Sequence, residues 1–253
     1  MTPLDVEPLR GWIGRTQRQA DEVSPRIVDS LWATLEVADA EPSIAGRLGG
    51  RNSASGVRLG GRSSASGMCA DRLPVMLHWC LAPEIDPLSR LAEDGHSLKG
   101  DFLPPVPLAR RLWAGVDVRF HDAFRLGDRV ERVSRVADVQ VKNGRSGPLC
   151  FVTLTHEFAT ARGAAVEERH HIVYRDHTAS SPPDAPSAGE PAPQWERRVQ
   201  IDSRRLFRYS ALTFNTHRIH YDFEYCRSEG YSGLLVHGPL QASLLAELAA
   251  SIG

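Results

Sequence analysis

The sequence predicts an α+β fold in which long antiparallel strands pack against helices. Between Leu112 and Asp176, apolar and polar residues alternate with a period of two, and turn signals interrupt the alternation. Residues 24–39, and the residues that follow Pro239, carry apolar side chains at helical spacing instead. The chain has 253 residues, of which 42% are hydrophobic and 24% charged, so it is long enough to bury a substantial core.

The first expected element is a helix from Ser24 to Asp39. Ser24 suits the N-cap position, and Pro25 suits the first turn, where its missing N–H costs nothing. One face of this helix is apolar, which predicts that it packs on the core. The residues of that face are Ile27, Val28, Leu31, Trp32 and Leu35.

A tandem repeat follows this helix. Residues 47–57 and 58–68 are identical at nine of eleven positions and consist mainly of Gly, Ser, Arg and Ala. Such a composition cannot bury much apolar surface, so we expect a flexible insertion. A phosphate-binding glycine-rich loop is the alternative, but the spacing and the lysine of a P-loop are missing.

Beyond the repeat, the apolar segment Leu73–Ala82 is expected to be buried. From Leu112 the pattern predicts three or four long antiparallel strands, with turn signals at Asn143-Gly144 and Arg162-Gly163. Residues 178–194 are rich in Pro, Ala and Ser and lack aromatic residues, which indicates a linker.

The part that follows the linker ends in a predicted helix. Pro239 stands at its start, and its apolar residues are Leu240, Leu244, Leu245 and Leu248. Without a sheet around it, this helix would expose a large apolar patch.

Charge and composition exclude several classes of partner. The net charge is −1 and no basic stripe is present, so nothing supports binding to nucleic acid. No apolar run approaches the roughly 18 residues of a membrane span. The four cysteines show no CxxC spacing, which indicates free thiols in a reducing cytoplasm.

The chemistry is concentrated in residues 214–240, FNTHRIHYDFEYCRSEGYSGLLVHGPL. This segment contains His217, His220 and His237. A metal site formed by His217, His220 and Asp222 is one interpretation, but no Cys or Glu stands at zinc-site spacing, so we expect no metal. A purely structural His220 on the surface is the other alternative.

The segment 214–240 resembles the signature of the MaoC-like hydratase/dehydratase family, whose hotdog fold wraps an antiparallel sheet around a long helix. The likeness is to the double-hotdog branch of mesaconyl-C4-CoA and itaconyl-CoA hydratases and type 2 hydroxyacyl-thioester dehydratases. Phrases of the first half that resemble this branch are GWIGRT, LHW, DGHSLKGDFLPPVPLARRLWAG, GRSGPLCFVTLTHE and IVYRD. The resemblance implies a first hotdog in residues 1–177, interrupted by the insertion 47–68, and a second in residues 195–253.

The resemblance implies a hydro-lyase that hydrates or dehydrates a short or branched, possibly dicarboxylic, acyl-CoA. Coenzyme A then enters as part of the substrate, and no cofactor is expected. The chain departs from the family in two ways. Asn215 stands at the position of a catalytic Asp. In the family, strands follow the central helix, whereas this chain ends at Gly253. The second hotdog is therefore expected to lack most of its sheet, so that a homodimer or a partner chain supplies it, or the fragment is inactive.

The expected catalytic residues are His220, Asn215 and Gly238. On an ideal helix Asn215 and His220 would lie about 140° apart, so they converge only if the chain turns between them, and the resemblance implies such a turn. His220 is then the base that takes a proton from water, since its ordinary pKa lies near neutrality, and Asn215 holds the water. The Gly238 N–H stabilises the enolate, because Pro239 has no N–H and a helix begins there.

The remaining expectations concern the surroundings. Tyr209, His217, His237 and Pro239 are expected on the substrate side of the site. A thioesterase, the third class considered, would need an acid on the last helix, where Glu247 is the only one. Other histidines are expected to be bystanders, and certain arginines are expected in solvated surface, with contacts to CoA phosphates as their alternative. These histidines are His78, His121, His156, His170 and His171, and the arginines are Arg110, Arg111 and Arg145.

Overall fold

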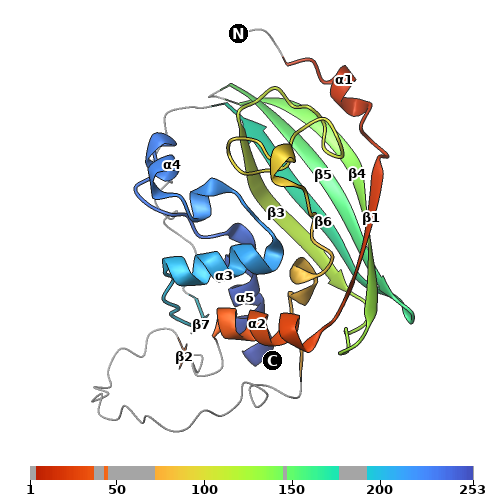
Figure 1. The fold of residues 1–253 in the computed structure, drawn as a ribbon, viewed down its shortest axis with the longest axis vertical. Coiled ribbons are helices and arrows are strands. Elements are labelled where there is room, and N and C mark those ends of the chain that lie inside the picture. Colours follow the sequence, from red (N-terminus) through yellow and green to blue (C-terminus); the bar gives the residue numbers. More distant parts are fainter. Residues whose placement is uncertain (1–3, 37–42, 45–71, 145–146, 177–192, 253) are drawn as a thin grey trace.

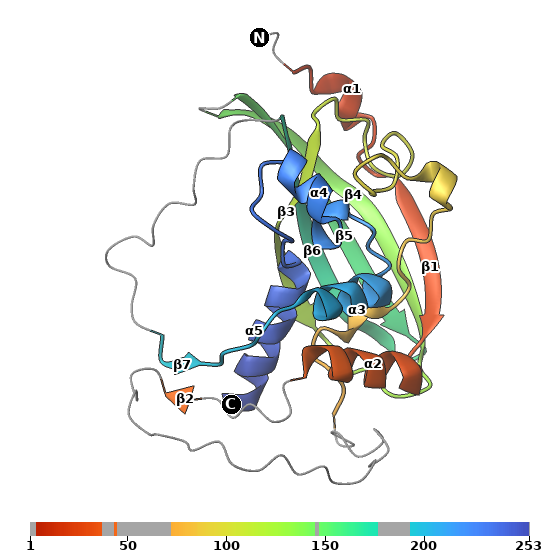
Figure 2. The ribbon, with the colours of Figure 1, turned by 60° about the vertical axis from the view of Figure 1, so that its left-hand side comes forward.

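The structure is a computed structural model that describes residues 4–36, 43–44, 72–144, 147–176 and 193–252. The tandem repeat 47–68, almost all of the linker 178–194, and Arg145 lie outside the described residues. Five antiparallel strands form a curved sheet in the order β1-β4-β5-β6-β3, and the helices α2, α3, α4 and α5 lie on one side of it (Figures 1 and 2). The strands are β1 (Thr16–Glu22), β3 (Arg110–Phe120), β4 (Arg129–Gly144), β5 (Gly147–Thr160) and β6 (Gly163–Arg175).

Short elements and helices complete the fold. Two further strands, β2 (Ser43–Ile44) and β7 (Trp195–Glu196), pair with each other. The helices are α1 (Glu7–Arg10), α2 (Pro25–Leu35), α3 (Ser203–Thr213), α4 (Phe223–Ser228) and α5 (Gly238–Ile252), with 3₁₀ turns η2 (Leu77–Cys80), η3 (Leu88–Arg90) and η4 (Arg218–His220). None of the helices in the described ranges has the length and apolar character of a membrane span.

The four long strands are those that the alternating pattern predicts. In β5 the even-numbered residues Cys150, Val152, Leu154 and Phe158 are buried, the first three in a cluster with Leu103 and Val106, and Phe158 in a cluster with helix α2. In β4 the register shifts between Val136 and Asp138, so the buried face changes parity there. Such a bulge cannot be seen in the alternation alone.

Strand β1 is not predicted from the sequence, and the reason is physical. Its sequence TQRQADE has no fully buried residue, because β1 lies at the edge of the sheet and pairs only with β4. Its partner supplies the backbone hydrogen bonds that hold it. A strand that buries so little side chain leaves no apolar alternation to detect.

Helix α2 begins as predicted and ends earlier. The Ser24 hydroxyl accepts a hydrogen bond from the Ile27 N–H at 3.3 Å, and Pro25 is the first helical residue. The helix stops at Leu35 because Glu36 adopts a left-handed conformation, with φ +45°. The predicted apolar face is buried, which confirms its role in the core.

One of the two hydrophobic clusters in the described part of the chain joins its two halves. Leu31 of α2 packs in the same cluster as Leu206 of α3, Leu240 of α5 and Phe158 of β5. These side chains come from both of the expected units, residues 1–177 and 195–253. The division into two units therefore stays a prediction.

Helix α5 has the predicted position, but only part of its apolar face is exposed, whereas a large exposed apolar patch was expected. Leu240 is fully buried, whereas the side chain of Leu245 is 65% exposed. In Figure 2, α5 lies beyond α3, along the side of the sheet that β3 borders. Within the described residues no strand follows α5, and an incomplete second hotdog stays a prediction.

Candidate active site

A cavity of about 680 Å³ opens where α3, η4 and the start of α5 face the beginning of β3. This volume lies within the range of small-molecule sites. Three of its walls matter for chemistry. Asn215, His217 and His220 come from the segment between α3 and η4, Gly238 and Pro239 from the start of α5, and His96, Arg111, Trp113 and His170 from the first half of the chain.

The end of α3 aims Asn215 at the cavity. Phe214 ends the helix in a left-handed conformation with φ +51°, which is unusual for a bulky residue, and strain of this kind is characteristic of functional sites. The chain then turns, because the Asn215 Oδ1 accepts a hydrogen bond from the His217 N–H at 2.9 Å. No acceptor among the described residues receives a hydrogen bond from the Asn215 NH₂ group, so this group is available to a ligand. The turn expected between Asn215 and His220 is therefore present.

His220 is held in one tautomer. Its Nδ1 lies 2.8 Å from the Leu235 carbonyl oxygen, which can only accept, so Nδ1 carries the proton and Nε2 keeps its lone pair. Burial lowers the pKa of His220, and the hydrogen bond to Leu235 opposes that shift. His220 is thus neutral at pH 7 and able to accept a proton.

Gly238 is a glycine because Trp113 leaves no room for a side chain. A Cβ on Gly238 would lie 2.3 Å from the Trp113 Cε3, well inside any real contact. Both residues line the cavity. The Gly238 N–H is at the first position of α5, where no acceptor for it exists among the described residues.

Gly95 brings a distant loop against this segment. Its φ is +88°, and a Cβ there would lie 1.9 Å from the Thr216 carbonyl oxygen. Two hydrogen bonds fix the contact: Thr216 Oγ1 donates to the Gly95 carbonyl at 2.5 Å, and the Arg218 N–H donates to the Asp94 carbonyl at 2.9 Å. The close approach sets the His96 ring 4.0 Å from the His217 ring.

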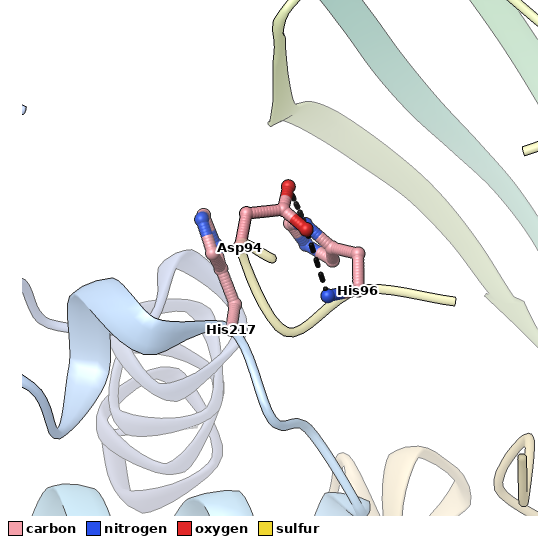
Figure 3. A group of neighbouring side chains, drawn as sticks. All are labelled: Asp94, His96 and His217. Carbon is pink, nitrogen blue, oxygen red and sulfur yellow. Dashed lines mark hydrogen bonds and ion pairs between the residues drawn. The ribbon is translucent and has the colours of Figure 1, made fainter. Parts of the chain in front are cut away.

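Asp94, His96 and His217 form a compact polar cluster (Figure 3). The Asp94 carboxylate accepts hydrogen bonds from the His96 N–H at 3.0 Å and from His96 Nδ1 at 2.8 Å. Burial works to raise the pKa of Asp94, but the hydrogen bonds from His96 outweigh it and keep the group ionised. Burial lowers the pKa of His96 to about 4, aided by the Arg111 charge, and lowers that of His217 to about 2.

This cluster is one of two groups in the described ranges whose donor atoms lie within 4.8 Å of one another, a spacing that a metal ion could bridge. The guanidinium of Arg111 nevertheless acts on both rings, and the same positive field disfavours a cation. The metal site considered from the sequence, formed by His217, His220 and Asp222, is not assembled. Asp222 instead caps helix α4, and its carboxylate pairs with Arg218 at 2.8 Å.

Tyr209 and His237 lie behind the cavity wall. Tyr209 is 1% exposed and His237 is fully buried. The His237 ring stacks on the His220 ring at 3.6 Å, and its Nε2 is hydrogen-bonded to the Ser210 hydroxyl. The cavity lining includes Asn215, His217, His220, Gly238 and Pro239. Their roles in binding or catalysis stay predictions.

The expectation that Arg110 and Arg111 belong to solvated surface is wrong. Arg110 is only 9% exposed and donates to the Glu229 carboxylate at 2.8 Å. Arg111 lines the cavity. Both stand at the first residues of β3, where the strand enters the sheet beside α4. The sequence shows two adjacent charges but not the burial that the neighbouring helix imposes.

His170 is a further cavity residue that sequence analysis set aside. Its Nδ1 lies 2.8 Å from the buried Glu168 carboxylate. This carboxylate also accepts a hydrogen bond from the Trp79 Nε1–H at 2.8 Å and lies 3.1 Å from His78 Nε2. Burial works to raise the pKa of Glu168, but hydrogen bonds from His170 and His78 overcome it. The alternation in β6 places His170 on the cavity side; no local motif marks it.

Glu247, the acid that a thioesterase would need, is not available for chemistry. It is 1% exposed, its Oε2 lies 2.6 Å from Arg72 Nη2, and its Oε1 accepts the Val75 N–H at 2.7 Å. It is absent from the cavity lining. The carboxylate therefore ties α5 to the segment before η2.

Comparisons with known proteins identify the family of this chain. The family described as "Hydroxyacyl-thioester dehydratase type 2" matches residues 76–252. A mesaconyl-C(4)-CoA hydratase of Chloroflexus aurantiacus is 40% identical over 243 residues, which are 94% of this chain and 77% of that protein. The chain belongs to the type 2 hydroxyacyl-thioester dehydratase family. As a member of this family the protein is a hydro-lyase. The resemblance to hydratases and dehydratases that residues 214–240 indicated is confirmed.

Solved structures confirm the α+β hotdog architecture of this family member. A MaoC-like dehydratase superposes with a TM-score of 0.56 at 14% identity, covering 96% of this chain and 78% of that one. A MaoC-like dehydratase from Phytophthora capsici gives 0.52 at 13% identity and covers 96% and 76% of the two chains. HtdX of Mycobacterium tuberculosis also gives 0.52 at 13% identity, with 91% and 74% covered.

Proposed function

We propose that this enzyme adds water to the double bond of a short, branched 2-enoyl-CoA such as mesaconyl-C4-CoA, or removes water in the reverse direction. The observation that carries this is the convergence of three groups on one cavity: a neutral His220, the Asn215 amide and the Gly238 N–H. The 40% identity to a mesaconyl-C(4)-CoA hydratase supports the acyl group.

His220 supplies the base. Its Nε2 takes a proton from water while the water oxygen forms a bond to carbon 3 of the acyl chain, and the π electrons move toward the thioester. Asn215 donates from its NH₂ group to the oxygen of that water and so fixes its position. An amide carries no ionisable proton, so Asn215 positions the water and His220 alone exchanges the proton.

Gly238 stabilises the negative charge that develops on the thioester oxygen. Its N–H is free, and the positive end of the 15-residue helix α5 reinforces it. An oxyanion donor of this kind lowers a barrier by about 3 kcal/mol. The imidazolium of His220 then returns its proton to carbon 2, which completes hydration and regenerates the neutral base.

The proposal requires no cofactor, since base, water and oxyanion donor suffice for the reaction. Three described cysteines, Cys80, Cys150 and Cys226, are buried and unpaired, which supports a reducing cytoplasm as the location. A thioesterase is disfavoured because Glu247 is engaged with Arg72.

The test follows the loss of enoyl-thioester absorbance with mesaconyl-C4-CoA, itaconyl-CoA and crotonyl-CoA. The wild-type protein is expected to be active on at least one of them, and His220→Ala to lose about 10³-fold in kcat, within reach of general-base and positioning effects. Wild type and His220→Ala equally inactive on all three would refute the proposal.

A further inference from the structure

Arg111 is a cation on the cavity wall that the mechanism above leaves unused. Among the described residues no ion pair includes it, and its Nη1 is buried without a hydrogen-bond acceptor. The buried Tyr174 hydroxyl lies beside it: burial raises the pKa of Tyr174, and the charge of Arg111 and a side-chain hydrogen bond with Arg111 oppose that shift. A buried guanidinium N–H without an acceptor is costly, so Arg111 points to an anion that arrives with the ligand.

The carboxylates already present do not satisfy Arg111. Asp94 is engaged by His96 through both its oxygens. Glu84 lines the same cavity, but burial raises its pKa and it makes no ion pair with Arg111 in the described structure. The small pocket beside the cavity is lined by Arg111, Asp94 and His217, which places the guanidinium next to this cluster.

His217 connects this cationic region to the base. Its ring lies 4.0 Å from His96 on one side and 5.5 Å from His220 on the other. No acceptor or donor among the described residues engages its ring nitrogens. A neutral imidazole has one N–H to donate, so His217 offers a second hydrogen bond to an anion held by Arg111.

The positions of the functional groups in a mesaconyl thioester match the sequence of Arg111, His217 and His220 along the cavity. Its free carboxylate and its methyl group stand on the carbon that water attacks, so the carboxylate must lie beside the base. We propose that Arg111, assisted by His217, binds the free carboxylate of a dicarboxylic acyl group and thereby selects such substrates; this rests on the proposed hydratase function. A guanidinium binds a carboxylate with two parallel hydrogen bonds, which also fixes the orientation of the double bond.

The expected effect is one of selectivity. A substrate without the carboxylate leaves Arg111 buried and unsatisfied, whereas the dicarboxylic substrate gains a charge-assisted hydrogen bond. Removing the guanidinium should therefore cost about 10- to 100-fold in kcat/KM for mesaconyl-C4-CoA. Crotonyl-CoA, which carries no second carboxylate, should lose less than about threefold.

The test compares Arg111→Met and Arg111→Lys with Arg119→Met, a control at an exposed arginine of the same strand. Each variant is assayed with mesaconyl-C4-CoA and crotonyl-CoA. The inhibition constant of 3-methylcrotonyl-CoA, in which a methyl group replaces the carboxylate, is also measured. We expect the mesaconyl:crotonyl selectivity to collapse in Arg111→Met, to fall part-way in Arg111→Lys, and to stay unchanged in Arg119→Met. Binding of 3-methylcrotonyl-CoA should be equal in all of them.

Three outcomes would overturn the inference. Equal losses of kcat/KM on both thioesters would show that Arg111 has a structural role. An unchanged mesaconyl:crotonyl selectivity with no loss on either thioester would show that Arg111 has no role in the reaction. A selectivity that disappears on dialysis against EDTA and returns with zinc would show that Asp94, His96 and His217 bind a cation instead. Failure of the hydratase proposal itself is distinguishable, since wild type would then hydrate none of the thioesters.

Discussion

The contact between Gly238 and Trp113 yields the sharpest prediction of the structure. Gly238→Ala would place a Cβ 2.3 Å from Trp113 Cε3, about 1.1 Å short of the 3.4 Å at which ordinary contact begins, and 2.8 Å from Cζ3. These atoms belong to a rigid ring, so either the indole or the first turn of α5 must move by about 1 Å. Overpacking of this kind destabilises a protein by about 1–3 kcal/mol.

In the proposed mechanism, the same movement shifts the Gly238 N–H away from the position that the enolate oxygen requires. A displacement of about 1 Å in a catalytic group reduces the rate by about 10²-fold. Because the proposed mechanism has this N–H act on the transition state, kcat should fall while KM changes little. The assay is steady-state hydration of mesaconyl-C4-CoA, combined with urea unfolding of the same variant.

Gly233→Ala is the matched control, because its Cβ would lie at an ordinary 3.7 Å from Phe223. Adding Trp113→Leu to Gly238→Ala should restore about 1–2 kcal/mol of stability relative to the sum of the single changes. A Gly238→Ala enzyme with wild-type kcat and stability, or a double variant with no coupling, would refute the packing argument.

Three further predictions concern ionisable groups. Because burial lowers the pKa of His220, the acid limb of kcat/KM should fall below pH 6.5, and a limb at or above 6.5 would contradict it. Burial lowers the pKa of His156 and His237 to about 3, so the unfolded chain binds more protons between pH 6.5 and 3. Chemical unfolding should then show stability falling with acidification, by at most about 1.4 kcal/mol per pH unit for each histidine, and flat stability would exclude this. Glu247→Gln should weaken the contact with Arg72 and lower the free energy of unfolding by about 2 kcal/mol, with kcat unchanged; lost catalysis in a stable variant would contradict a structural role.

Much of the fold follows from the sequence because its signals are local. Ser24 and Pro25 mark the start of α2, and Pro239 marks the start of α5. The long central strands follow from their alternation. Edge strand β1 does not, since it buries too little side chain, and the parity change after Val136 depends on pairing with β5.

The site divides in the same way. Asn215, His220 and Gly238 come from one continuous segment, so a motif can identify them. His96 and Arg111 come from segments far away in the chain, and the contact between Gly95 and Thr216 that brings the loop in spans 121 residues. Their place at the cavity depends on a positive φ and on strand register, which no spacing in the sequence reveals.

The central claim is that water adds to the double bond of a thioester that stays intact, with His220 as the base. The most direct measurement is hydration of mesaconyl-C4-CoA in H₂¹⁸O, followed by mass spectrometry. The account predicts ¹⁸O in the hydroxyl group of an acyl-CoA product, at a rate about 10³-fold lower in His220→Ala. Label in a free carboxylic acid together with released coenzyme A, or equal rates in both proteins, would contradict it.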